Sequence, residues 1–187
     1  MARSNASGAK EVATRRDFLK ASTTVASAAA LGTLNIGVYA GGSDIIRLGM
    51  IGCGGRNSGA ADQALTADKG VRLVAMCDIF MDRAKAVREM LKSRKADQVA
   101  VDDDHCFAGF DGYKRVIEAS DVVVIANAAK FHPLHALAAI QAGKHVFVEK
   151  PHGIDPLGMK TMKKAADTAK EKGLCLASGL HSRHHAG

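Results

Sequence analysis

The stretch IIRLGMIGCGGRNSG, residues 45–59, decides the fold of this chain. Residues 45–52 form an almost unbroken apolar run, which predicts a strand buried on both faces of a parallel sheet. Glycines follow at once, and the residues after them have helical character. A strand that passes through glycines directly into a helix is typical of a turn that holds an anion on backbone N–H groups. We therefore expect a βα unit with an anion site at the helix N-terminus.

The glycines of this turn have separate roles. Gly52 allows the tight turn, and Gly54 lets the backbone approach a pyrophosphate. The third glycine of the pattern G-x-G-x-x-G is replaced by Asn57. We expect this change to loosen the packing of helix on strand slightly, or Asn57 to adopt a left-handed backbone, with Gly55 and Gly59 compensating. The loop residues expected to contact a bound dinucleotide are Gly52, Cys53, Gly54, Gly55, Arg56 and Asn57.

An acidic residue ends the second apolar run, VRLVAMCD, residues 71–78. A carboxylate at that point accepts hydrogen bonds from a ribose 2′-hydroxyl and repels a 2′-phosphate, so Asp78 favours NAD over NADP. Arg83 complicates this preference if it reaches back toward the ribose. Two alternatives stay open: Asp78 caps the next helix, or the protein is a methyltransferase that binds S-adenosylmethionine with the same two features.

The rest of the chain alternates apolar runs with helical segments. Further strands are expected over 121–127, 144–151 and from 174, and helices over 81–95, 114–120, 133–143 and 155–173. Residues 96–113 are the least readable, with a short strand near Cys106 and Phe107. This alternation predicts right-handed βαβ units and an α/β fold, a Rossmann-type doubly wound parallel sheet.

The N-terminal region has the features of an export signal. The residues TRRDFLK, 14–20, precede a stretch rich in Ala, Ser and Thr that ends in VYA at Ala40. This pattern predicts a twin-arginine signal over residues 1–40, cleaved after Ala40 and followed by a linker over 41–45. A retained membrane anchor is the alternative. We expect the twin-arginine machinery as a partner and a periplasmic or otherwise extracytoplasmic location, for a protein that folds around its cofactor before export.

Composition and charge argue against a nucleic-acid partner. The 187 residues are 47% hydrophobic and 24% charged, an ordinary globular balance. Part of the net charge of +7 lies in the signal, and the remainder is spread over helix faces among acids. Aromatic residues make up only 4% and Trp is absent, so the sequence offers no stacking platform for single strands.

The cysteines predict neither a zinc site nor a disulfide framework, because no two stand at short paired spacing. They are Cys53, Cys77, Cys106 and Cys175. Cys77 and Cys175 lie in apolar runs, so we expect both to be buried.

A third motif, AGKHVFVEKP at residues 142–151, makes a family resemblance visible. Together with IGCGGR, Asp78, CFAGFDGY, the run 121–151 and GLHSRHH, it makes residues 46–185 similar to the Gfo/Idh/MocA family of nicotinamide-dependent oxidoreductases. The chain looks most like the exported bacterial members. The E-K-P signature of that family stands intact as Glu149, Lys150 and Pro151.

The resemblance implies a role for each matching residue. Glu149 and Lys150 would lie beside the nicotinamide ribose, and Lys150 would be catalytic, next to the substrate hydroxyl that loses its proton as hydride departs. The Lys150–Pro151 bond would be cis, as in family members. Asn127 would lie by the diphosphate or ribose, and His132 on the nicotinamide side. The alternatives are a solvated strand-end lysine for Lys150 and a helix-start histidine for His132.

The resemblance also implies a second α/β domain after residue 180, which supplies most of the substrate pocket and a homo-oligomer interface. We therefore expect a dinucleotide-binding domain over 46–180 and the start of a truncated substrate domain over 181–187. His181 and His184 of HSRHH, residues 181–185, have the spacing of metal ligands, but no carboxylate or cysteine stands nearby as a third ligand. A pocket-lining role is therefore favoured for Arg183 or one of the histidines.

Three functions follow as expectations. The first is an NAD-dependent oxidoreductase acting on a sugar or polyol, present as its cofactor half, which alone would bind dinucleotide weakly and turn over little. The second is a glycoside hydrolase of the same family that uses NAD transiently. The third is a non-catalytic nucleotide-binding fragment.

Overall fold

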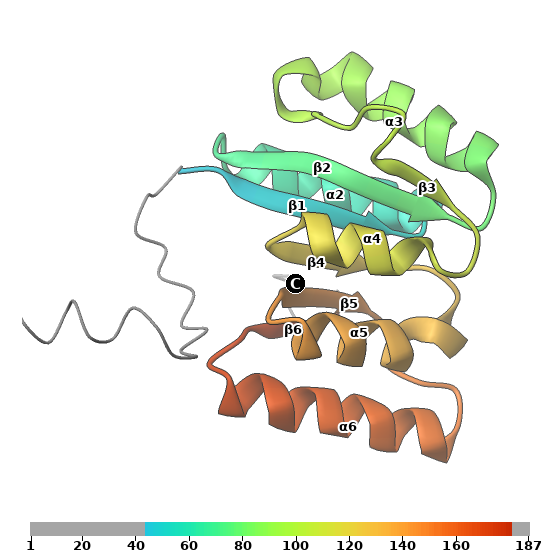
Figure 1. Cartoon of the computed structure of the whole chain (residues 1–187), viewed down its shortest axis with the longest axis vertical. Helices are drawn as coiled ribbons and strands as arrows, with labels where there is room; N and C mark the ends of the chain where they lie inside the picture. Colours follow the sequence, from blue (N-terminus) through green and yellow to red (C-terminus); the bar gives the residue numbers. More distant parts are fainter. Residues whose placement is uncertain (1–43, 181–187) are drawn as a thin grey trace, which may run out of the picture. The chain divides into compact units, whose positions relative to one another are not determined.

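A computed structural model describes residues 44–180, and within them six parallel strands form one sheet. The strand order is β3-β2-β1-β4-β5-β6 (Figure 1). The strands are β1 (Ile46–Ile51), β2 (Val71–Asp78), β3 (Cys106–Ala108), β4 (Val122–Ile125), β5 (His145–Glu149) and β6 (Leu176–Gly179). This is the predicted doubly wound Rossmann sheet. The predicted export signal, residues 41–43 of the linker and residues 181–187 lie outside the described residues.

Helices connect the strands and cover both faces of the sheet. They are α2 (Gly55–Ala67), α3 (Met81–Lys95), α4 (Gly112–Ala119), α5 (His132–Gln141) and α6 (Pro156–Glu171), with the short 3-10 turns η2 (Ala96–Gln98) and η3 (Ala129–Phe131). Buried residues of α2 and α3 join one apolar core, and those of α4, α5 and α6 join the other. No helix of residues 44–180 is both long and apolar enough to span a membrane.

The central strands are apolar on both faces because each serves both cores. In β1, Met50 packs toward α2 and α3 while its neighbour Ile51 packs toward α4, α5 and α6. Val123 and Val124 of β4 divide in the same way, and all four residues are less than 5% exposed. Successive side chains of a strand point to opposite faces, so a strand buried on both faces reads as a continuous apolar run.

Most ends of the helices and strands lie within two residues of the predicted ones. Asp155 caps α6, its carboxylate accepting a hydrogen bond of 2.6 Å from the Gly158 amide. The strand expected over 121–127 ends at Ile125, so Asn127 lies in the loop beyond it. Cys175 was expected to be buried, and this was wrong: its side chain is exposed next to the final strand β6.

Candidate functional site

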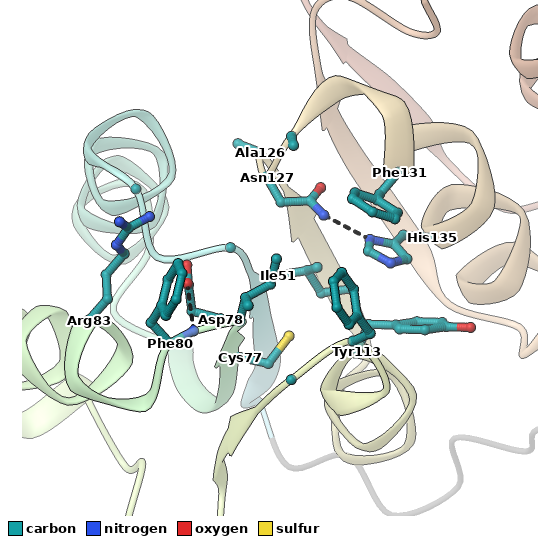
Figure 2. A pocket seen from close by; sticks show the side chains of 16 residues that line it. Ile51, Cys77, Asp78, Phe80, Arg83, Tyr113, Ala126, Asn127, Phe131 and His135 are labelled. Carbon is teal, nitrogen blue, oxygen red and sulfur yellow. Dashed lines mark hydrogen bonds between the residues drawn. The ribbon is translucent and has the colours of Figure 1, made fainter.

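A cavity of about 240 Å³ opens at the carboxyl ends of β1, β2 and β4 (Figure 2). The chain leaves β1 toward β2 on one side and reaches β4 on the other, so this is the point where the strand order reverses. Open α/β sheets bind their ligands at such a point. The residues that line it are Ile51, Gly52, Gly54, Cys77, Asp78, Ile79, Phe80, Arg83, Gly109, Phe110, Tyr113, Ala126, Asn127, Ala128, Phe131 and His135.

Gly52 makes the turn between β1 and α2, and only glycine fits there. Its φ is +89°, and a Cβ at this position would lie 2.6 Å from the Cβ and 2.8 Å from the Cα of Asn127. The Gly52 amide donates a hydrogen bond of 2.8 Å to the Cys77 carbonyl, which fixes the turn against β2. The backbones after β1 and β4 are therefore in direct contact at the cavity.

The first turn of α2 is shaped to accept an anion. Gly54 is its N-cap, no side chain caps the helix, and no acidic residue stands in its first turn. A Cβ placed on Gly54 or Gly55 would meet no atom within 4 Å, so the space over this backbone is open. Free N–H groups and the positive end of the helix dipole then face that space. The site fits the diphosphate of a dinucleotide.

Asn57 ties α2 to the sheet, which corrects the expected loosening. Its side chain is fully buried, and its Nδ2 donates to the carbonyls of Ile51 at 2.8 Å and Gly52 at 2.7 Å. A longer contact of 3.4 Å reaches the carbonyl of Val124 in β4. Asn57 lies within α2 and has no left-handed backbone. Hydrogen bonds thus replace the close packing that a glycine would give.

Asp78 stands between the glycine loop and α3. Its Oδ2 accepts a hydrogen bond of 2.7 Å from the Cys53 amide, and its Oδ1 accepts one of 3.1 Å from the Phe80 amide. Phe80 is the N-cap of α3, and no side chain caps that helix, so Asp78 does not have the capping role. The Arg83 guanidinium lies 5.3 Å from the centre of the Phe80 ring and lines the same corner of the cavity.

Aromatic side chains form the opposite wall of the cavity, and Figure 2 shows the Asn127 amide pointing at one of them. The rings of Tyr113 and His135 stack with centroids 4.3 Å apart, and Phe131 lies on His135 at 5.9 Å. Nδ2 of Asn127 lies 3.1 Å from Nδ1 of His135, while Oδ1 of Asn127 is buried with no partner among the described residues. An acceptor without a donor in a cavity wall fits a bound hydroxyl or amino group.

Burial lowers the pKa of His135 to about 4, and the nearby His132 adds to the effect. The His135 ring is therefore neutral at pH 7, and its Nδ1 accepts the hydrogen bond from the Asn127 amide. Sequence reasoning missed Tyr113 and His135, which come from α4 and α5 and meet only through the topology of the sheet.

Acid is expected to destabilise this wall through His135. Its pKa lies below the ordinary 6.5 in the folded state, so between pH 6.5 and about 4 the unfolded chain binds more protons. Stability should fall as pH falls through that window, by on the order of 3 kcal/mol. Urea denaturation at pH 7 and pH 4.5 measures this difference in stability. The difference should be much smaller in His135→Gln, whereas His105→Gln, at a half-exposed site, should show the same difference as wild type.

His132 lies behind the cavity wall rather than in it. The ring is 2% exposed, with Nδ1 2.8 Å from the Pro151 carbonyl and Nε2 3.0 Å from the Asn127 carbonyl. It therefore joins the loop after β4 to the segment after β5. Its contact with the nicotinamide stays a prediction.

Glu149 and Lys150 lie at the end of β5, next to β4 in the sheet. The Glu149 carboxylate is buried and forms an ion pair with Arg56 of α2. Lys150 is exposed, and its bond to Pro151 is cis, as the resemblance implied. Neither residue lines the cavity, and their contact with a dinucleotide stays a prediction.

The cysteines of the site do not act as nucleophiles. Burial raises the pKa of Cys77 to about 12, and burial together with the Asp78 carboxylate raises the pKa of Cys53 well above its ordinary value. Both remain thiols at pH 7. Across residues 44–180, no three His, Cys, Asp or Glu side chains gather as metal ligands.

Known proteins match this chain in sequence and structure. A glycosyl hydrolase family 109 protein of Solibacter usitatus is 33% identical over 147 residues, which are 73% of this chain and 32% of that protein. The inositol 2-dehydrogenase of Acidothermus cellulolyticus is 35% identical over 106 residues, 57% of this chain and 28% of that one. The chain thus spans about a third or less of the length of these curated relatives.

A solved structure and a family model also match this chain. The 3-ketoreductase of Actinomadura kijaniata, in complex with NADP and TDP-benzene, superimposes with a TM-score of 0.57 at 27% identity, over 75% of this chain and 39% of that one. The model of the oxidoreductase family with an NAD-binding Rossmann fold, GFO_IDH_MocA, matches residues 46–180. With the glycine turn, Asp78 and the E-K-P motif in their expected places on the sheet, this chain belongs to that oxidoreductase family.

Proposed function

We propose that this domain is the cofactor half of an oxidoreductase that moves a hydride between nicotinamide and a carbinol carbon of a sugar or polyol. The observation that carries the proposal is the edge of the sheet where the α2 N-terminus, Asp78 and Lys150 follow three parallel strands. Relatives named inositol 2-dehydrogenase and 3-ketoreductase support the substrate class. We further propose that residues 1–40 direct export by the twin-arginine route.

The residues of the cavity would hold the dinucleotide in a fixed direction. Backbone N–H groups of the α2 first turn bind the diphosphate, and the Asp78 carboxylate accepts hydrogen bonds from the adenosine ribose. Because a 2′-phosphate next to Asp78 would be repelled, NAD is the preferred form. Arg83 lines the same corner and would weaken that preference.

Lys150 would act on the substrate oxygen. Bound NAD supplies the hydride acceptor. The hydroxyl proton would pass to water, and the Lys150 ammonium would stabilise the negative charge that the oxygen then gains. The carbonyl would form as hydride leaves the carbinol carbon. The exposed position of Lys150 at the end of β5 leaves its side chain free to reach a substrate.

A hydrolase is the second candidate, favoured by the relatives named glycosyl hydrolase family 109 proteins. Such an enzyme would oxidise a sugar with NAD, eliminate the group attached to it and return the hydride. One assay separates the candidates: stoichiometric full chain with NAD, polyols, sugars and nitrophenyl glycosides, followed at 340 nm and 400 nm. NADH formation supports the oxidoreductase, and nitrophenol release without net NADH supports the hydrolase. NAD binding with neither signal supports a non-catalytic module.

Lys150→Met is expected to remove NADH formation while NAD affinity stays within about threefold, since the lysine acts on the substrate and not on the diphosphate. The loss in single-turnover rate should be about hundredfold or more. Lys160→Met, an exposed lysine of α6, is the matched control and should change neither quantity. A Lys150→Met chain that keeps its rate would contradict the role given to Lys150.

A further inference from the structure

An ion pair crosses the carboxyl end of β4. Arg56 belongs to the first turn of α2, which follows β1, and Glu149 ends β5. In the sheet β4 lies between β1 and β5 (Figure 1). The ion pair therefore joins residues from the two strands that flank β4. The pair joins the diphosphate end of the site to the E-K-P end.

The Glu149 carboxylate is held on several sides. It is 4% exposed, and its Oε2 accepts a hydrogen bond of 3.2 Å from the Lys150 amide. A Cβ on Gly179 of β6 would lie 2.5 Å from Cδ of Glu149, so only glycine leaves room for the carboxylate there. Within residues 44–180, the ion pair with Arg56 is the only polar contact of Oε1.

Arg56 is exposed whereas Glu149 is buried, and this difference indicates that Glu149 depends on Arg56 more than Arg56 depends on Glu149. Its side chain is 45% exposed and forms its ion pair with Glu149. The buried carboxylate needs the cation, because a buried charge without a partner is costly, whereas the exposed guanidinium loses little in water. A bound diphosphate already has the free N–H groups of α2.

We propose that Arg56 is a positioning residue, which holds the Glu149 carboxylate, and the Lys150 backbone bonded to it, in place for the nicotinamide-side ribose. This rests on the proposed function and deepens it: Arg56 contributes to binding of the second ribose through Glu149, and the diphosphate is held by the backbone. Arg56, a residue of the glycine loop, would therefore couple recognition of the second ribose to that loop.

The test compares ADP, ADP-ribose and NAD as ligands of the full chain, by calorimetric titration. ADP carries the diphosphate without the second ribose, ADP-ribose adds that ribose, and NAD adds the nicotinamide. Arg56→Gln is expected to weaken ADP-ribose and NAD about tenfold and ADP less than about threefold. Arg56→Lys should recover part of the loss. Lys163→Gln, which breaks an exposed ion pair with Asp167 on α6, is the control and should change none of the three.

A double-mutant cycle with Glu149→Gln gives the decisive comparison. If Arg56 acts through Glu149, adding Arg56→Gln to Glu149→Gln should change ADP-ribose affinity less than about twofold. The double variant has no lone buried charge, so this comparison holds even where Arg56→Gln alone unfolds. Additive losses, or equal losses for ADP and NAD, would make Arg56 a diphosphate ligand and overturn the inference. A wild-type chain that binds none of the three ligands would instead overturn the proposed function.

Discussion

Gly52→Ala should abolish dinucleotide binding and lower the free energy of unfolding by about 3 kcal/mol or more. Two costs add at this position. Alanine is strained at φ +89°, and its Cβ would lie 2.6 Å from the Cβ of Asn127, where real side chains do not approach. The clash cannot be relieved locally, because the Gly52 amide is bonded to Cys77 of β2. The β1 turn and the loop after β4 would have to separate.

Urea denaturation and NAD titration of the full chain measure both effects. Gly59→Ala is the matched control: it lies within α2, a Cβ there meets nothing within 4 Å, and we expect a gain of about 0.5–1 kcal/mol with NAD affinity unchanged. Gly54→Ala should separate the two effects, since its Cβ also meets nothing but would stand where a diphosphate approaches. A Gly52→Ala chain as stable as wild type would refute the contact with Asn127.

Asp78→Asn should weaken NAD binding about thirtyfold and reduce the preference for NAD over NADP. Asparagine keeps the shape of the side chain and one oxygen for the Cys53 amide, so the glycine loop should stay in place, while the hydrogen bond from the Phe80 amide is lost. The substitution removes the negative charge of the carboxylate. The charged hydrogen bonds from the ribose hydroxyls, worth about 2 kcal/mol, are then lost, and so is the repulsion of a 2′-phosphate. NADP should gain relative to NAD, because Arg83 lies in the same corner of the cavity.

Calorimetric titration with both cofactors measures the change. Asp82→Asn removes an exposed charge from the first turn of α3 and serves as the control, with the ratio of NAD to NADP affinity expected within about twofold of wild type. If Asp78→Asn leaves that ratio unchanged, the carboxylate does not select the cofactor.

The elements with strong local signals were predictable from the sequence. The apolar run 71–78 and the charged segment 81–95 coincide with β2 and α3 at both ends. β3 was only approximately placed, because this three-residue edge strand pairs with β2 alone and has only Cys106 and Phe107 buried. A short strand with one neighbour has no long apolar pattern to read.

The residues of the candidate site also divide into those that local sequence predicts and those that depend on the topology of the sheet. The glycine turn and Asp78 are contained in short segments whose chemistry depends on local spacing, so sequence reasoning reached them. The stacking of Tyr113 on His135 and the pairing of Arg56 with Glu149 join residues far apart in the chain, and depend on which strands become neighbours. Asn57 was misread because a buried amide can replace the close contact of a glycine with hydrogen bonds of its own.

The most direct test of the dinucleotide site is an NMR titration of the ¹⁵N-labelled full chain with NAD. The site predicts saturable shifts at the amides of residues 52–57, at Asp78 and at the Asn127 side chain, while the amides at the amino ends of the strands stay unchanged. If millimolar NAD leaves the amides of residues 52–57 unshifted in a folded chain, the glycine loop does not bind a dinucleotide.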